Sequence, residues 1–226
     1  MPLMEHIREL RRRVLVSAAA VLGGTALSLI VTRPVIGGLQ EMCTVCEYIF
    51  IRPTEAFAAY FRVALVLGLV LAMPVVLFQA VAFVMPGLHP HERRYLLLML
   101  PGAAALFALG LAFGYFVVVP RAVDFLATFL MGSATPAWSL GMYIAFVTNL
   151  LFVIGLTFQT PLVVLVLAKV GLATPARLTR YRRHAVLVCA IAAAVLTPTP
   201  DPVTMFLVMV PMLVLYELGI LLSRII

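Results

Sequence analysis

The chain has 226 residues, of which 64% are hydrophobic and only 11% are charged. A soluble domain has roughly 45–50% apolar and about 25% charged residues, so this composition excludes an ordinary soluble protein and indicates an integral membrane protein. The net charge of +7 comes from 16 basic and 9 acidic residues. In a membrane protein such an excess favours cytoplasmic loops that face anionic lipid, and it does not point to nucleic acid.

The first 13 residues are polar and amphipathic, and no small-residue cleavage site follows the first apolar run. We therefore expect no cleaved signal peptide and a first span that stays in the mature chain. In this segment Glu5 and Glu9 share a helical face, with Arg8 and Arg12 one turn further on. By itself the pattern fits an interfacial helix that is stabilised by ion pairs and anchored to anionic lipid. The opposite, apolar face is formed by Met4, Ile7, Leu10 and Val14.

Six apolar runs predict an all-α integral membrane protein with six transmembrane helices, because about 20 apolar residues cross roughly 30 Å of hydrocarbon. The fifth run has only about 13 residues, or roughly 20 Å of helix. The sixth is interrupted by Pro211 and Glu217. A re-entrant hairpin formed by these last two runs is the alternative to two short spans. The predicted spans are Val14–Thr32, Val63–Met85, Tyr95–Val119, Gly141–Ala168, Ala185–Thr197 and Val203–Leu222.

The basic residues predict the orientation, because cytoplasmic loops of membrane proteins are enriched in Arg and Lys. With six spans, twelve basic residues fall on the side of the N-terminus and four on the other, which makes both termini cytoplasmic. The opposite side carries the loops 33–62 and 121–140, and we expect Arg121–Leu130 to lie on the membrane surface. The twelve are Arg8, Arg11, Arg12, Arg13, Arg93, Arg94, Lys169, Arg177, Arg180, Arg182, Arg183 and Arg224, and the four are Arg33, Arg52, Arg62 and Arg121.

The connector Pro86-Gly-Leu-His-Pro-His-Glu-Arg-Arg94 joins the second and third runs and places one carboxylate, Glu92, among two arginines and two histidines. Glu92 can pair with a neighbouring arginine on the surface, which would be worth about 0–1 kcal/mol. It can instead receive a guanidinium from another molecule through paired, charge-assisted hydrogen bonds. The residues alone leave both interpretations open.

Three cysteines occur, two of them as a C-x-x-C pair, Cys43 and Cys46, in a polar loop. The second half of a four-ligand zinc site is missing, and we expect neither a metal nor another cofactor. An extracytoplasmic disulfide, free thiols, and metal or redox chemistry all remain as interpretations of the pair. Cys189 lies in an apolar run and is expected to be a small packing residue.

Eight short motifs follow one another through essentially the whole chain, and together they resemble the TatC family, the receptor subunit of the twin-arginine protein translocase. The motifs are His6-Ile-Arg-Glu-Leu-Arg-Arg-Arg13, Ala72-Met-Pro-Val-Val-Leu-Phe-Gln79, Ala82-Phe-Val-Met-Pro-Gly-Leu88, His91-Glu-Arg-Arg94, Phe113-Gly-Tyr-Phe-Val-Val-Val-Pro120, Gly155-Leu-Thr-Phe-Gln-Thr-Pro161, Leu196-Thr-Pro-Thr-Pro-Asp201 and Tyr216-Glu-Leu218.

The resemblance implies a cytoplasmic-side receptor for twin-arginine signal peptides, in which Glu9 and Glu92 bind the arginine pair. Carboxylates can hold guanidinium groups bidentately, whereas Lys cannot reproduce that geometry. Nearby positive charge would keep both carboxylates ionised. The resemblance also assigns to this site Arg11, Phe83, His91, Arg93 and Arg94.

The resemblance further implies that Gln159 and Met205 lie where partner subunits of the TatA/TatB type, each with a single span, dock. An interhelical hydrogen bond worth roughly 0.6 kcal/mol is the alternative role of Gln159. Because a Gln side chain does not titrate, the residue disfavours any role that requires a titratable proton at this position. Asp-Pro turn chemistry is the alternative role of Asp201. The residues implied to matter in the extracytoplasmic turn and loop are Asp201, Pro200, Pro34 and Phe57.

As a whole the resemblance implies a non-enzymatic translocase core subunit in the cytoplasmic membrane, which self-associates and moves folded proteins at the expense of the proton-motive force. A small-solute secondary transporter is the alternative function, but such proteins usually show inverted repeats and ionisable groups at the midplane. The deep polar residue here is a neutral Gln, and no corresponding halves are visible. A membrane-embedded enzyme is also disfavoured, because the four histidines lie at or near cytoplasmic ends and no HExxH occurs.

Overall fold

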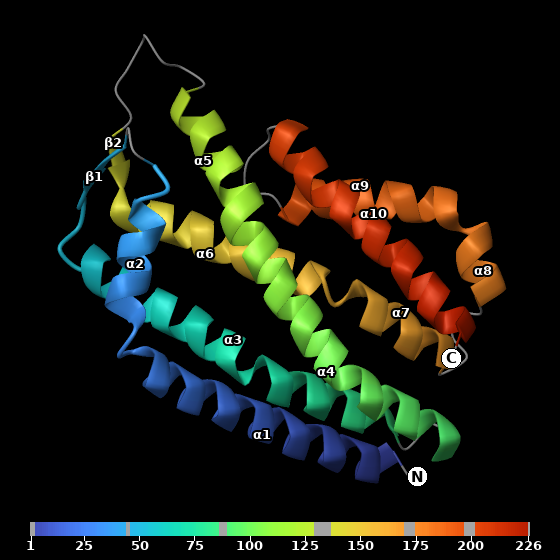
Figure 1. The fold of residues 1–226 in the computed structure, drawn as a ribbon. Coiled ribbons are helices and arrows are strands. Elements are labelled where there is room, and N and C mark those ends of the chain that lie inside the picture. The colour runs from blue at the N-terminus through green and yellow to red at the C-terminus, as the bar shows by residue number, and fades with distance from the viewer. Residues whose placement is uncertain are drawn as a thin grey trace.

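The computed structural model describes residues 3–43, 46–85, 90–128, 137–169, 175–196 and 202–225 (Figure 1). It is helical apart from two three-residue strands. The elements in chain order are α1 (Leu3–Ser28), α2 (Thr32–Gln40), β1 (Glu47–Ile49), α3 (Glu55–Val84), α4 (Pro90–Phe113), the π-helical turn η2 (Gly114–Val118), α5 (Val119–Thr128), β2 (Ala137–Ser139), α6 (Leu140–Thr157), α7 (Thr160–Lys169), α8 (Pro175–Arg180), α9 (Arg182–Leu196) and α10 (Pro202–Ile225).

Four helical stretches within the described ranges are long and apolar enough to cross a membrane: 55–84, 97–128, 140–169 and 202–224. They coincide with the predicted second, third, fourth and sixth spans. The helices α1 and α2, bent by 75° at their junction, add a fifth if they count as one span. The predicted fifth span corresponds to α9, whose 15 residues extend about 22 Å. The all-helical membrane architecture is thus confirmed, while the count of six spans and the orientation stay predictions.

The outward faces of these helices are apolar. Leu22, Leu98, Phe116 and Val195 are each more than 70% exposed. Soluble monomers rarely expose large contiguous apolar patches. The exposed side chains are therefore suited to contact lipid tails, which agrees with the composition.

The third predicted span is longer than expected, because α4 continues through η2 into α5 as one helical stretch up to Thr128. The expectation that Arg121–Leu130 lies on the membrane surface is wrong for residues 121–128. The reason is the apolar face of α5, where Val119, Ala122 and Val123 are fully buried in the largest core cluster. The amphipathic helix α5 thus packs its apolar face against protein.

Both termini lie at one end of the molecule, and α2, β1 and β2 lie at the other (Figure 1). We call these three elements the cap. The strands β1 and β2 pair in parallel, with Tyr48 opposite Trp138. Neither strand was expected, because three residues are too few to show the alternation that identifies a strand in sequence.

The helices α1 and α3 run side by side along most of their length (Figure 1). Gly24 and Gly68 lie at the closest approach, where an added Cβ on Gly24 would stand 2.5 Å from the Gly68 carbonyl oxygen. Nearby, the Ser28 hydroxyl donates to the Ala64 carbonyl at 2.6 Å. Small residues that bring two backbones together are the usual means of helix association in membranes.

This contact predicts that Gly24→Ala destabilises the protein by about 1–3 kcal/mol, because the new methyl group meets backbone that cannot rotate away. The adjacent Gly23→Ala is a matched control, since its Cβ would have no heavy atom within 4 Å. Thermal unfolding of both variants in detergent measures the difference. Equal midpoints would show that the helices separate at little cost.

Candidate functional site

A charged cleft of about 580 Å³ lies between α1 and α3, toward the end that holds the termini. It contains Glu9, one of the two predicted receptor carboxylates. Acidic and basic side chains alternate around it, because α1 presents residues 5, 8, 9, 12 and 13 toward the same opening. The lining residues are Glu5, Arg8, Glu9, Arg12, Arg13, Val16 and Gln79.

The Glu9 carboxylate already holds a guanidinium. Arg13 donates to Glu9 Oε1 from Nη2 at 2.8 Å and from Nε at 3.2 Å. A third donor, Arg13 Nη1, reaches across to Gln79 Oε1 on α3 at 3.0 Å. The two charged side chains are about a quarter exposed, at 23% for Glu9 and 26% for Arg13. The pair is therefore partly withdrawn from solvent, and it ties the two helices together.

Phe83, also predicted for this site, lies near the C-terminal end of α3 and stacks on the His6 ring of α1 at a centroid distance of 4.4 Å. The structure thus brings Glu9 and Phe83 to the same pair of helices. Arg11 is not brought into the cleft, since it lines a separate hollow with Arg8, Arg12 and Leu15. Sequence reasoning did not single out His6, Arg13 or Gln79 as site residues, although all three stand inside the motifs quoted above.

The backbone of Glu92 lies among the first five residues of α4, together with His91, Arg93 and Arg94. Their side chains lie outside the described residues, so the predicted meeting of Glu92 with Glu9 stays a prediction. The start of α4 does lie at the same end of the molecule as the start of α1 (Figure 1).

Gln159 is 6% exposed and stands in the short break between α6 and α7. Pro161 follows it and cannot donate a backbone hydrogen bond, which explains a break at this point. The Gln159 side chain donates from Nε2 to the Ala103 carbonyl of α4 at 3.1 Å. The interhelical hydrogen bond considered from sequence is therefore present. Its Oε1 has no hydrogen-bond partner within the described part of the chain.

The remaining predicted residues lie away from the cleft. Met205 is half-buried and packs against the largest core cluster. Pro34 is exposed in the first turn of α2, and Phe57 is 68% exposed at the start of α3, with its ring 4.5 Å from that of Phe61. Pro200 and Asp201 lie outside the described residues.

Glu55, which sequence reasoning missed, joins the start of α3 to β2 and α6. Its Oε1 accepts hydrogen bonds from the Ser139 hydroxyl and, at 2.6 Å, from the Gly141 amide. Its Oε2 accepts from the amides of Ile51 at 2.8 Å and Arg52 at 3.2 Å. A Cβ on Gly141 would stand 2.5 Å from Glu55 Cγ, so the glycine makes room for this contact. The sequence Pro53-Thr54-Glu55, which is typical of a helix start, was the signal that could have drawn attention to this carboxylate.

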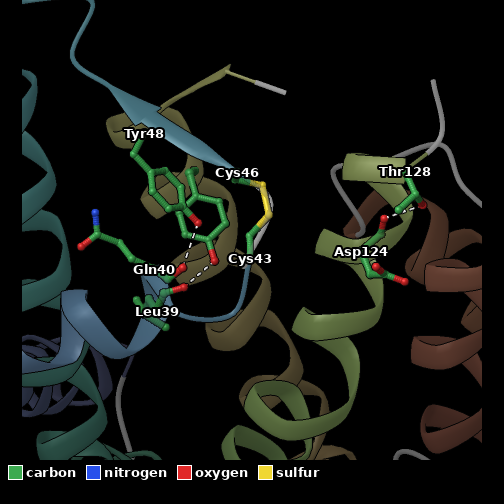
Figure 2. The surroundings of a disulfide bond; sticks show 8 residues. Leu39, Gln40, Cys43, Cys46, Tyr48, Asp124 and Thr128 are labelled. Atoms are coloured by element: carbon green, nitrogen blue, oxygen red, sulfur yellow. Dashed lines mark hydrogen bonds between the residues drawn. A yellow bond between two sulfur atoms is a disulfide. The ribbon is translucent and has the colours of Figure 1, made fainter. Parts of the chain in front are cut away.

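Cys43 and Cys46 form a disulfide at the edge of the cap (Figure 2). Of the three interpretations of the C-x-x-C pair, the structure contains the disulfide. Beside it, the Tyr143 hydroxyl donates to the Leu39 carbonyl at 2.5 Å and the Tyr48 hydroxyl to the Gln40 carbonyl at 3.2 Å. Burial raises the pKa of Tyr48, against a smaller lowering by Tyr143, so its hydroxyl stays a donor at neutral pH.

Cys189 is a buried free thiol, as expected of a small packing residue.

An all-helical, lipid-facing bundle with a charged cleft at one end and a disulfide-bonded cap at the other defines a multi-pass membrane protein. Comparison with known families makes this specific, since the family model described as Sec-independent protein translocase protein (TatC) matches residues 5–211. The chain belongs to the TatC family.

Individual relatives agree with this assignment over nearly their full length. The chain is 36% identical to the Sec-independent protein translocase protein TatC of Carboxydothermus hydrogenoformans, covering 99% of this chain and 93% of that one. It is also 36% identical to the TatC of Aquifex aeolicus, with 99% and 95% covered. A crystal structure of the twin arginine translocase receptor TatC superposes with a TM-score of 0.80 at 33% identity, covering 97% of this chain and 98% of that chain.

Proposed function

We propose that this Sec-independent translocase protein is the receptor for twin-arginine signal peptides and the core subunit of a translocase for folded proteins. It acts in the cytoplasmic membrane, catalyses no reaction of its own, and uses the proton-motive force. The observation that carries the receptor role is the contact in the cleft. Glu9 accepts two N–H groups of one guanidinium, which is the chemical group that a twin-arginine peptide presents.

Selectivity for arginine follows from this geometry. Guanidinium is planar and always charged, and it offers several N–H donors in a fixed fork, whereas ammonium is a point charge on a flexible stem. A carboxylate that is only 23% exposed gains more from such a contact than a fully solvated one, because less water competes for it. In the proposed complex Glu9 and Glu92 each bind one arginine of the peptide, with Phe83 beside them.

The proposed orientation places the cleft on the cytoplasmic side and the cap outside. Two independent features support it. Basic residues gather in the segments that lie with the termini. The disulfide lies in the cap, and disulfides persist in oxidising compartments rather than in the cytosol. In this orientation α9 is a short span that leads from cytoplasmic α8 to the extracytoplasmic side.

We also propose that single-span subunits of the TatA/TatB type dock near Gln159. An apolar groove of about 550 Å³ runs beside it between α4, α7 and α10, and Ala103 and Pro161 are among its lining residues. Gln159 Oε1 is buried without a partner in the described part of the chain. A buried unsatisfied acceptor calls for an explanation, and a donor from a neighbouring helix would supply one.

The receptor role predicts that Glu9→Gln or Glu92→Gln weakens binding of a twin-arginine peptide by about 10- to 100-fold, because a charge-assisted pair is lost. Titration of a labelled peptide onto the purified protein measures this. The control Glu47→Gln alters an exposed carboxylate on β1, at the opposite end, and leaves binding unchanged. Wild-type protein that binds a twin-lysine peptide equally well would overturn the receptor role.

The orientation predicts that the disulfide can be reached from outside the cell. After brief reduction of intact cells, a membrane-impermeant maleimide should label the wild-type protein, whereas the Cys43→Ser/Cys46→Ser variant stays unlabelled because Cys189 is buried. Labelling that requires cell lysis would reverse the proposed orientation.

The docking role predicts that Gln159→Leu abolishes co-purification of the single-span partners and transport of cargo. Stability should change by less than about 1 kcal/mol, because the variant loses one hydrogen bond but also removes a buried unsatisfied oxygen. Thermal unfolding and co-purification measure the two effects. A variant that still transports cargo normally would show that Gln159 serves only the contact between α4 and α7.

A further inference from the structure

We infer that Arg13 is a resident competitor for the receptor carboxylate, and that Gln79 positions it for that role. The inference rests on the proposed function of Glu9. Arg13 fills the place that a ligand guanidinium would take, since it donates twice to Glu9 Oε1 and once to Gln79 Oε1. The empty receptor is thus occupied by its own arginine.

The contact exceeds what an ordinary helical ion pair needs. Residues four apart on a helix commonly pair, so Glu9 and Arg13 could meet without any function. Gln79 is different, because it lies 66 residues further along the chain on α3 and has its acceptor within reach of the third guanidinium nitrogen. Two helices therefore contribute acceptors to one guanidinium, which is the arrangement of a built binding site.

The neighbouring arginines show that the pairing is selective. Arg8 and Arg12 line the same cleft, yet neither forms an ion pair with Glu9 among the described residues. Charge alone thus does not determine which arginine Glu9 accepts. The added acceptor on α3 distinguishes Arg13 from the other two.

Exchange of one guanidinium for another is chemically conservative. The arriving arginine would replace Arg13 at Glu9 with the same kind of charge-assisted hydrogen bonds. The carboxylate is thus paired with a guanidinium in the empty state and in the bound state.

A resident competitor has a quantitative signature. It lowers the apparent affinity of every ligand for Glu9 by the same factor, because only the fraction of receptor with a free carboxylate can bind. Removal of Arg13 should therefore tighten binding of twin-arginine and twin-lysine peptides alike and leave their ratio unchanged. If Arg13 served only to orient Glu9, its removal would weaken binding and reduce the ratio.

The test compares Arg13→Gln and Arg13→Lys with Arg12→Gln and Arg12→Lys in the purified full-length protein, titrated with the two peptides. Arg13→Gln should tighten both by roughly fivefold to tenfold, the range expected for a partly exposed charged pair. Arg13→Lys should tighten both by a smaller factor without a change in charge. The Arg12 variants make the same changes of charge and side chain at another position in the cleft. We expect them to change the affinity for either peptide by less than twofold.

A double-variant cycle tests the role of Gln79. Gln79→Leu should tighten binding in the wild-type background, because Arg13 loses an anchor, and should have no effect when Arg13 is already Gln. An effect that persists in Arg13→Gln would mean that Gln79 contacts the peptide directly and would overturn its assigned role.

Three results separate the inference from the function on which it rests. Weaker binding or a reduced ratio in Arg13→Gln, or equal tightening in Arg12→Gln, would overturn the resident competitor while leaving the receptor role intact. Wild-type protein that does not prefer twin arginine would overturn both. Thermal midpoints of all variants confirm that the compared proteins are folded, and Arg13→Lys serves as the milder change.

Discussion

The close contact between α1 and α3 is the constraint on which the proposed receptor site depends. Gly24 and Gly68 let the two backbones approach until a single methyl group would not fit between them. Because the helices lie side by side over most of their length, this contact also helps to set the register at the charged end. There it brings Glu9 and Arg13 of α1 opposite Gln79 of α3, and His6 against Phe83. A contact between small residues in the apolar part of the bundle thus determines how charged residues meet at its edge.

The charged cleft illustrates how a membrane protein can keep a carboxylate available. An unpaired ion at the edge of the hydrocarbon is costly, and a permanently paired one is unavailable to a ligand. In the proposed receptor an internal guanidinium solves both problems, since it compensates the carboxylate and would be exchanged for the same group on a peptide. In the proposed receptor this arrangement lowers the affinity for the peptide and keeps the carboxylate of the empty site compensated.

The opposite end of the molecule is held together by a different set of interactions. The Glu55 carboxylate collects donors from its own helix start and from the start of α6, and the parallel pair β1–β2 lies beside it. The disulfide and the two tyrosine hydroxyls bind the end of α2 to the same region (Figure 2). Polar contacts and a covalent bond thus close the cap.

The sequence by itself determined the membrane class, four of the spans, and the family, because long apolar runs and motifs in order are local or linear properties. It also marked Glu9 and Phe83. Helical spacing allows Glu9 to pair with Arg12 or Arg13, three and four residues further on, and the added acceptor on α3, which only the tertiary structure supplies, is found at Arg13. The same holds for Glu55, whose donors lie up to 86 residues away, and for the strands, which are too short to carry a pattern. α5 was misjudged for a related reason, since an amphipathic stretch fits a membrane surface and a protein core equally well, and only the packing of α5 against α6 and α10 shows which of them covers its apolar face.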